Sequence, residues 1–143
     1  MNPGIRRALT LLLLLWLGGT FAELTLFGHW EDPVQLIPLG VVPAAAGSLI
    51  ALSLRPGTAT RRAFQLAMCL LVATGAAGVA LHYRANLEFQ REVDPGAAQW
   101  LLMSKALHAK APPALAPASL TLIGSFGLVL AQGHLNDGRT RGR

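Results

Sequence analysis

The feature that most constrains this chain is a set of apolar runs long enough to cross a lipid bilayer. Residues 8–28 follow Arg6 and Arg7, are almost wholly apolar and hold Glu23 as their only charge. Because a helix needs about 20 apolar residues to cross a hydrocarbon core of about 30 Å, this run predicts a first span. Composition agrees: only 13% of residues are charged, against about a quarter in soluble domains.

Three further apolar runs cover residues 34–54, 63–82 and 117–132. The second contains Pro38 and Pro43, which membrane helices tolerate. No glycine or proline follows Val79 until after Asp94, so we expect the third helix to continue to about Val93. Glycines and alanines in the third and fourth runs offer surfaces for close helix approach. We therefore predict an all-α fold, a transmembrane four-helix bundle in which residues 1–143 form one membrane domain.

The first run leaves an alternative open, because it also resembles a signal peptide. Two arginines precede a leucine run, and Ala22 is the small residue that a cleavage site favours. The apolar run continues through Leu24, Leu26 and Phe27, which is longer than a typical signal-peptide core. Cleavage after Ala22 would leave three spans instead of four.

Between the third and fourth runs we predict an interfacial helix over residues 95–110. Asp94 and Pro95 are typical of an N-cap followed by proline at the first helical position. Steps of 100° then place Trp100, Met103 and Leu107 on one side, so the helix would lie on the outer membrane surface with Trp100 as an anchor.

Loop charges predict the orientation. One side of the four spans holds most of the basic residues: Arg6, Arg7, Arg55, Arg61, Arg62, Arg139, Arg141 and Arg143. The other side holds Arg84, Arg91, Lys105 and Lys110. Basic loops stay in the cytoplasm, so we expect both termini to be cytoplasmic and the loop from about residue 83 to 116 to be extracytoplasmic.

Acidic and histidine residues gather at the predicted outer end. The candidate polar site, for an ion, a proton or a metal, comprises Glu23, His29, Glu31, His82, Asn86, Glu88 and Glu92. Glu23 is the sharpest signal, because a carboxylate inside a span usually faces a cavity or a partner. The structural alternative is that Glu23 lies close enough to the surface to bind water or another helix. The spacing of His82, Asn86, Phe89 and Val93 places them on one packed helix face.

If the first and third spans are neighbours, His29, Glu31, His82 and either Glu88 or Glu92 could form a site for a transition-metal ion. Simpler interpretations compete with this one. Asp32 before Pro33 is typical of an N-cap, and Glu31 would favour the same helix end. Glu88 and Glu92 lie at helical spacing from Arg84 and Arg91, which favours a solvated, ion-paired face. The metal itself cannot be identified from this pattern.

Several functions are disfavoured. The basic residues are dispersed among apolar segments, which argues against nucleic-acid binding despite a net charge of +5. A single cysteine, Cys69, permits no intrachain disulfide or CxxC motif. No nucleophile triad or phosphate-binding loop is present, so no catalytic or cofactor-binding residue is assigned.

Three segments resemble a family of small, uncharacterised bacterial membrane proteins with four predicted helices: ELTLFGHWEDPVQLIPL (23–39), LHYRANLEFQREVDPG (81–96) and ALAPASL (114–120). The resemblance covers about half of the chain. It implies a bacterial inner-membrane protein with the same span pattern, and it brings no activity or catalytic residue with it.

The leading functional hypothesis is a non-enzymatic accessory or assembly subunit, which docks another membrane protein or forms a homo-oligomer. The second is cation or proton binding and transport through the outer Glu and His residues. The third is a metal-dependent membrane enzyme, although four helices and one loop offer little room for a substrate pocket.

Overall fold

The computed structural model describes residues 2–28, 30–109 and 116–140, and this part of the chain is helical without strands. The elements are α1 (Pro3–Leu26), the 3-10 helix η1 (Pro33–Gln35), α2 (Leu36–Leu54), α3 (Thr58–Val93), α4 (Gln99–Leu107) and α5 (Ala116–Thr140). The predicted all-α class is confirmed, and each predicted run lies mostly in an α-helix. His29, Lys110, Arg141 and Arg143 lie outside the described residues.

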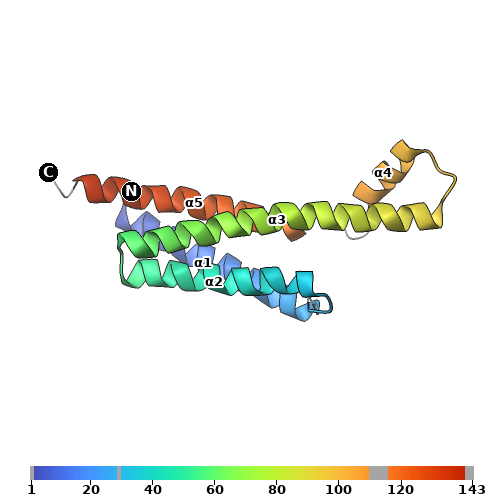
Figure 1. The fold of residues 1–143 in the computed structure, drawn as a ribbon. Helices are drawn as coiled ribbons and strands as arrows, with labels where there is room; N and C mark the ends of the chain where they lie inside the picture. Colours follow the sequence, from blue (N-terminus) through green and yellow to red (C-terminus); the bar gives the residue numbers. More distant parts are fainter. Residues whose placement is uncertain (1, 29, 110–115, 141–143) are drawn as a thin grey trace.

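Helices α1, α2, α3 and α5 run side by side, and α3 extends well beyond the others (Figure 1). Helix α2 contacts α1 and α3, while α5 contacts α3 and α1, and α4 folds back onto the far end of α3. The start of α1, the α2–α3 turn and the end of α5 lie at one end of the molecule (Figure 1). The α1–α2 connection lies at the other end, from which α3 projects.

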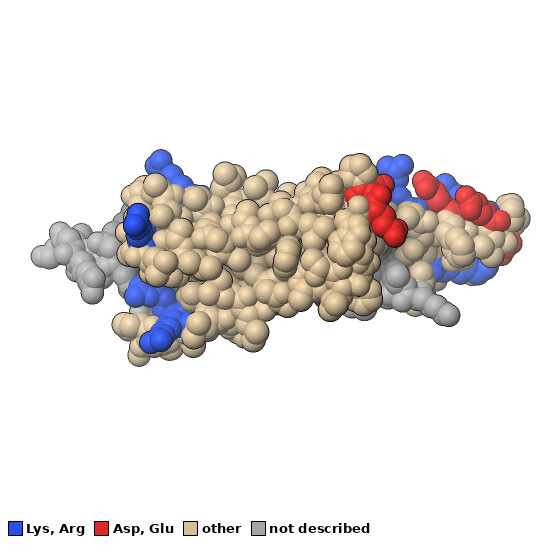
Figure 2. Space-filling view, turned by 90° about the horizontal axis from the view of Figure 1, so that it is seen from below, with Lys and Arg blue, Asp and Glu red and all other residues tan. Residues whose placement is uncertain are grey.

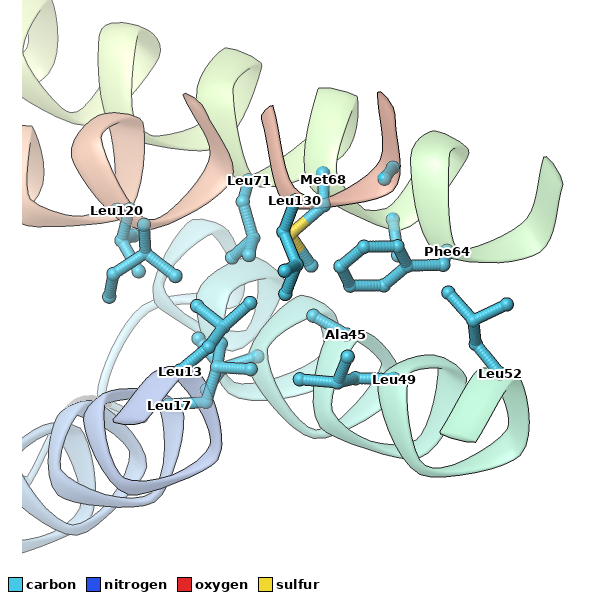
Figure 3. Packing of buried hydrophobic residues seen from close by; sticks show 14 residues of the cluster. Leu13, Leu17, Ala45, Leu49, Leu52, Phe64, Met68, Leu71, Leu120 and Leu130 are labelled. Atoms are coloured by element: carbon cyan, nitrogen blue, oxygen red, sulfur yellow. The ribbon is translucent and has the colours of Figure 1, made fainter. Parts of the chain in front are cut away.

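The four side-by-side helices share one apolar core (Figure 3). Leu13 and Leu17 of α1 meet Leu49 of α2, and Phe64 and Met68 of α3 complete the centre. Leu120, Ile123 and Leu130 contribute from α5. The buried residues recur at three- and four-residue intervals, so each helix presents one stripe inward.

The contact between α3 and α5 depends on glycines. A Cβ atom built on Gly75 would lie 2.6 Å from the backbone nitrogen of Thr121, and one on Gly124 would lie 2.6 Å from the carbonyl oxygen of Met68. A Cβ on Gly127 would overlap the side chain of Met68. The small-residue surfaces predicted on these two helices are therefore where the backbones approach each other.

Three helical stretches of the described chain are long and apolar enough to cross a membrane: Pro3–Leu26, Pro33–Leu54 and Thr58–Val93. The apolar part of α5, Pro117–Gln132, is shorter. Many leucines on these helices point away from the core, Leu15 and Leu54 among them. Soluble proteins rarely expose so much contiguous apolar surface, so the composition of these helices suits a lipid environment.

The start of α2 follows the predicted pattern. The Asp32 carboxylate accepts a hydrogen bond from the Val34 backbone N–H at 2.8 Å, and the Gln35 side-chain oxygen accepts one from the Glu31 N–H at 3.1 Å. Asp32 thus caps η1, which leads directly into α2. Helix α2 continues through Pro43, as expected for a proline within an apolar helix.

The predicted start of the short helix is wrong. Asp94 is the C-cap of α3 rather than an N-cap, and α4 begins at Gln99 after the N-cap residue Ala98. Pro95 and Gly96 form a turn instead, in which the Ala97 N–H donates to the Asp94 carbonyl at 3.2 Å. This turn reverses the chain, and the Asp94 carboxylate pairs with Lys105 at 3.1 Å across the resulting hairpin.

Candidate functional site

Charged side chains occupy the two ends of the molecule, and the face drawn in Figure 2 has an uncharged middle. Arg55, Arg61 and Arg62 lie at the end where α2 turns into α3. The acidic residues of the described chain whose side chains can be placed lie at the opposite end: Glu23, Glu31, Asp32, Glu88, Glu92 and Asp94. The predicted gathering of acidic residues at one end therefore appears in three dimensions, and Arg84, Arg91 and Lys105 share that end.

Glu23 lies in the last turn of α1, and its side chain is exposed. It makes no side-chain hydrogen bond or ion pair with any residue that the structure describes. Trp16, Gly19, Phe27 and Trp30, which share its helical stripe, are also exposed. The carboxylate thus lies on the exposed face of α1, away from the core.

Glu31 is exposed in the α1–α2 connection, and its backbone is held by Gln35. Because Asp32 serves as a helix cap, His29 is the candidate ligand in this connection. His29 lies outside the described residues. The predicted involvement of His29 in a site stays a prediction.

The outer part of α3 packs through a different face from the predicted one. His82, Phe89 and Val93 are exposed, and of the predicted set only Asn86 is half-buried. The half-buried positions Tyr83, Asn86, Leu87 and Gln90 form the inner face instead. The reason is the hairpin: α4 covers one side of α3, and the sequence spacing alone does not say which.

Asn86 has a structural role in this hairpin. Its side-chain amide donates a hydrogen bond to the Ala106 carbonyl oxygen of α4 at 3.3 Å. Leu102 and Ala106 are buried against α3, with Leu102 only 4% exposed. Glu88 and Glu92 are exposed on the other sides of α3. Asn86 therefore joins α4 to α3.

The predicted convergence depends on α1 lying beside α3, and these helices are not in contact within the described chain. They lie diagonally, separated by α2 and α5. No three His, Cys, Asp or Glu residues of the described chain are close enough together to hold a metal ion. A site completed by His29 remains a hypothesis, since that residue lies outside the described part of the chain.

Sequence reasoning missed the contact that holds α4 in place. Leu102 and Ala106 are four residues apart and face α3, whereas the predicted stripe of Trp100, Met103 and Leu107 is exposed. The four-residue spacing of Leu102 and Ala106 was available as a signal. The larger apolar side chains of Trp100, Met103 and Leu107 form a different stripe, and that stripe is the one predicted to lie on the membrane surface.

The fold defines a class: the part of the chain that the structure describes is all-helical and holds three helices long and apolar enough to span a membrane. Comparison of the chain with protein-family models, curated proteins and solved structures finds no match.

Proposed function

We propose that the chain is an integral membrane protein in which α1, α2, α3 and α5 form a four-helix bundle that crosses the bilayer. Helix α5, whose apolar part is shorter, is included in the bundle because it packs against the apolar part of α3. Gly124 and Gly127 lie against Met68, and Thr121 lies beside Gly75, all within the apolar part of α3. A helix packed along the membrane-spanning part of another must lie at the same depth.

The proposed location is a bacterial inner membrane, with the arginine-rich end in the cytoplasm and both termini inside. Arg55, Arg61 and Arg62 support this orientation, since basic residues near span ends are retained in the cytoplasm. The hairpin of α3 and α4 then lies on the extracytoplasmic side.

The role that the geometry supports best is a non-enzymatic accessory subunit whose hairpin docks another membrane protein. The observation that carries it is the projection of α3. With 36 residues at about 1.5 Å each, α3 is about 54 Å long, against a hydrocarbon core of about 30 Å. The projecting part therefore lies outside the lipid core, and α4 braces it.

This projecting hairpin carries exposed apolar side chains. Trp100 is 72% exposed and Phe89 is 60% exposed, and Met103, Leu107 and Val93 are also exposed. Apolar residues that face lipid need no partner, but those outside the lipid core do. Exposed aromatic residues on a rigid support are typical of protein-binding surfaces.

The test is purification of the full chain in mild detergent with identification of bound proteins. The double variant Trp100→Ala/Leu107→Ala should lose a co-purifying partner that the wild type retains. Leu122→Ala, at an exposed position of α5, is the control and should retain it. A wild type that always runs as a solitary monomer without bound protein would contradict the docking role, and a second copy of the chain would indicate a homo-oligomer.

The exposed stripe of α4 could instead lie on the headgroup layer, as an interfacial helix. Brominated lipids distinguish these cases in a Trp16→Phe/Trp30→Phe background, where Trp100 is the remaining tryptophan. The docking role predicts little quenching of Trp100 fluorescence in liposomes. Strong quenching would favour the interfacial helix.

Cation or proton transport and a metal-dependent activity remain competing hypotheses. Transport would use Glu23 and His82, which lie on helices that are not neighbours in the described chain. The metal-dependent activity would use His29 and His82, and His29 lies outside the described residues. Elemental analysis of the purified protein and ion flux in liposomes test them. Bound metal, or flux that Glu23→Gln or His82→Ala abolishes, would overturn the docking role as the primary function.

A further inference from the structure

Three arginines surround the turn between α2 and α3. Arg55 is the C-cap of α2, and Arg61 and Arg62 follow at the start of α3. The Thr60 hydroxyl fixes the turn, because it donates to the Arg55 carbonyl oxygen at 2.9 Å and accepts from the Gly57 N–H at 3.1 Å. The turn thus holds three arginine residues close together along the backbone at the end of two apolar helices.

These arginines lack a counter-charge in the described chain. None of the three makes a side-chain hydrogen bond or ion pair with a residue that the structure describes, and the first turn of α3 contains no acidic residue. Cations at a helix N-terminus are unfavourable, since that end already carries partial positive charge. The positive charge of these three arginines is therefore not neutralised by any described residue.

Among the three arginines, Arg61 shows the clearest unsatisfied polar group. Its Nε atom is buried and has no hydrogen-bond partner. A buried donor on a charged group is costly when it is left unsatisfied. An anion beside the half-buried Arg61 side chain would offset that cost electrostatically, and the N-cap residue Gly57 leaves the N-terminal backbone N–H groups without a side-chain cap.

Apolar surface lies directly beside the arginines. Leu54 is 76% exposed and Leu66 is 63% exposed, so both helices present leucines next to the guanidinium groups. A free phosphate would gain nothing from these leucines. A phosphate that carries acyl chains would bury them.

We propose that Arg55, Arg61 and Arg62 bind the phosphate group of an anionic phospholipid headgroup, with the acyl chains along Leu54 and Leu66. Guanidinium groups bind phosphate oxygens through paired hydrogen bonds, and basic residues at span ends recognise anionic headgroups. Arg61 is half-buried beside the turn and lacks a partner for its Nε atom, and the exposed Arg55 and Arg62 complete the positive charge. This inference rests on the proposed membrane location, concerns the end of the molecule opposite the hairpin and does not depend on the docking role.

The test is thermal stability of the full chain in mild detergent with added phosphatidylglycerol, phosphatidylcholine or inorganic phosphate. Phosphatidylglycerol should raise the Tm of the wild type. In Arg61→Gln/Arg62→Gln, its apparent affinity should fall by about tenfold or more, as expected for lost charge-assisted hydrogen bonds. Arg84→Gln/Arg91→Gln removes the same charge at the other end and should retain the effect.

Other outcomes would overturn the proposal. Equal stabilisation by phosphatidylcholine would show that lipid in general acts here, and equal stabilisation by inorganic phosphate would show that the acyl chains are not recognised. An unchanged response in the Arg61→Gln/Arg62→Gln variant would place the lipid elsewhere. If that variant does not fold, Arg61→Lys replaces it, and native mass spectrometry should show weaker retention of phosphatidylglycerol than in the wild type.

Discussion

Single glycines decide how closely α3 and α5 approach. We expect Gly75→Ala to destabilise the protein, because the new Cβ would lie within 2.7 Å of backbone atoms of Thr121 and Pro117, which cannot rotate away. Overpacking of this kind costs about 1–3 kcal/mol. Thermal denaturation in detergent measures the loss of stability.

Gly47→Ala is the matched control for this prediction. Gly47 lies on the exposed side of α2, and a Cβ there would meet nothing within 4 Å. The control should leave stability unchanged or raise it slightly, because alanine favours helix more than glycine does. Equal losses in both variants would mean that the α3–α5 contact is not specifically tight.

At the scale of elements, α4 depends on two buried side chains. Leu102→Ala should release α4 from α3, because Leu102 and Ala106 are the buried residues of this short helix. Truncation of a buried leucine costs about 2–5 kcal/mol, whereas the exposed Asp94–Lys105 ion pair contributes at most about 1 kcal/mol. Amide hydrogen exchange over residues 99–107 should become much faster.

Met103→Ala provides the comparison in the same helix, since Met103 is exposed. Its exchange should match that of the wild type. Slow exchange in the Leu102→Ala variant would contradict the assigned packing and would mean that α4 is held by contacts other than Leu102.

The existence of the helices could be predicted from the sequence, and their packing could not. An apolar run of about 20 residues has few alternatives to a helix, because lipid cannot satisfy backbone groups. By contrast, Asp94 and Pro95 carry the same local signal whether they begin a helix or end one. Only the reversal of the chain onto α3 decides between them.

The described residues of the candidate site lie apart for a related reason. Periodicity finds the faces of one helix, but it does not say which helices are neighbours. The predicted convergence of His29, Glu31 and His82 requires α1 to lie beside α3, whereas these helices are diagonal. The exposed state of His82 likewise depends on which face α4 covers, which is a tertiary choice.

For the whole molecule, the packing of α1 bears on whether the first span is removed. Leu13 and Leu17 are fully buried in the shared core, so cleavage after Ala22 would expose the side chains that they cover. We therefore expect α1 to be retained in membranes. Intact mass spectrometry of the purified chain should give a mass that includes residues 1–22, and a chain that begins at Glu23 would contradict this expectation.

The orientation is tested with single cysteines in a Cys69→Ala background. Gly96→Cys lies in the α3–α4 turn and Gly57→Cys in the α2–α3 turn; a side chain at either glycine meets no close contact, and neither has a positive φ. A membrane-impermeant maleimide should label Gly96→Cys in intact spheroplasts. Gly57→Cys should react only after permeabilisation, because the arginines beside it hold that end in the cytoplasm. The reverse labelling would invert the topology, placing the arginine cluster outside and the exposed apolar hairpin in the cytoplasm, where any docking partner would then have to be sought.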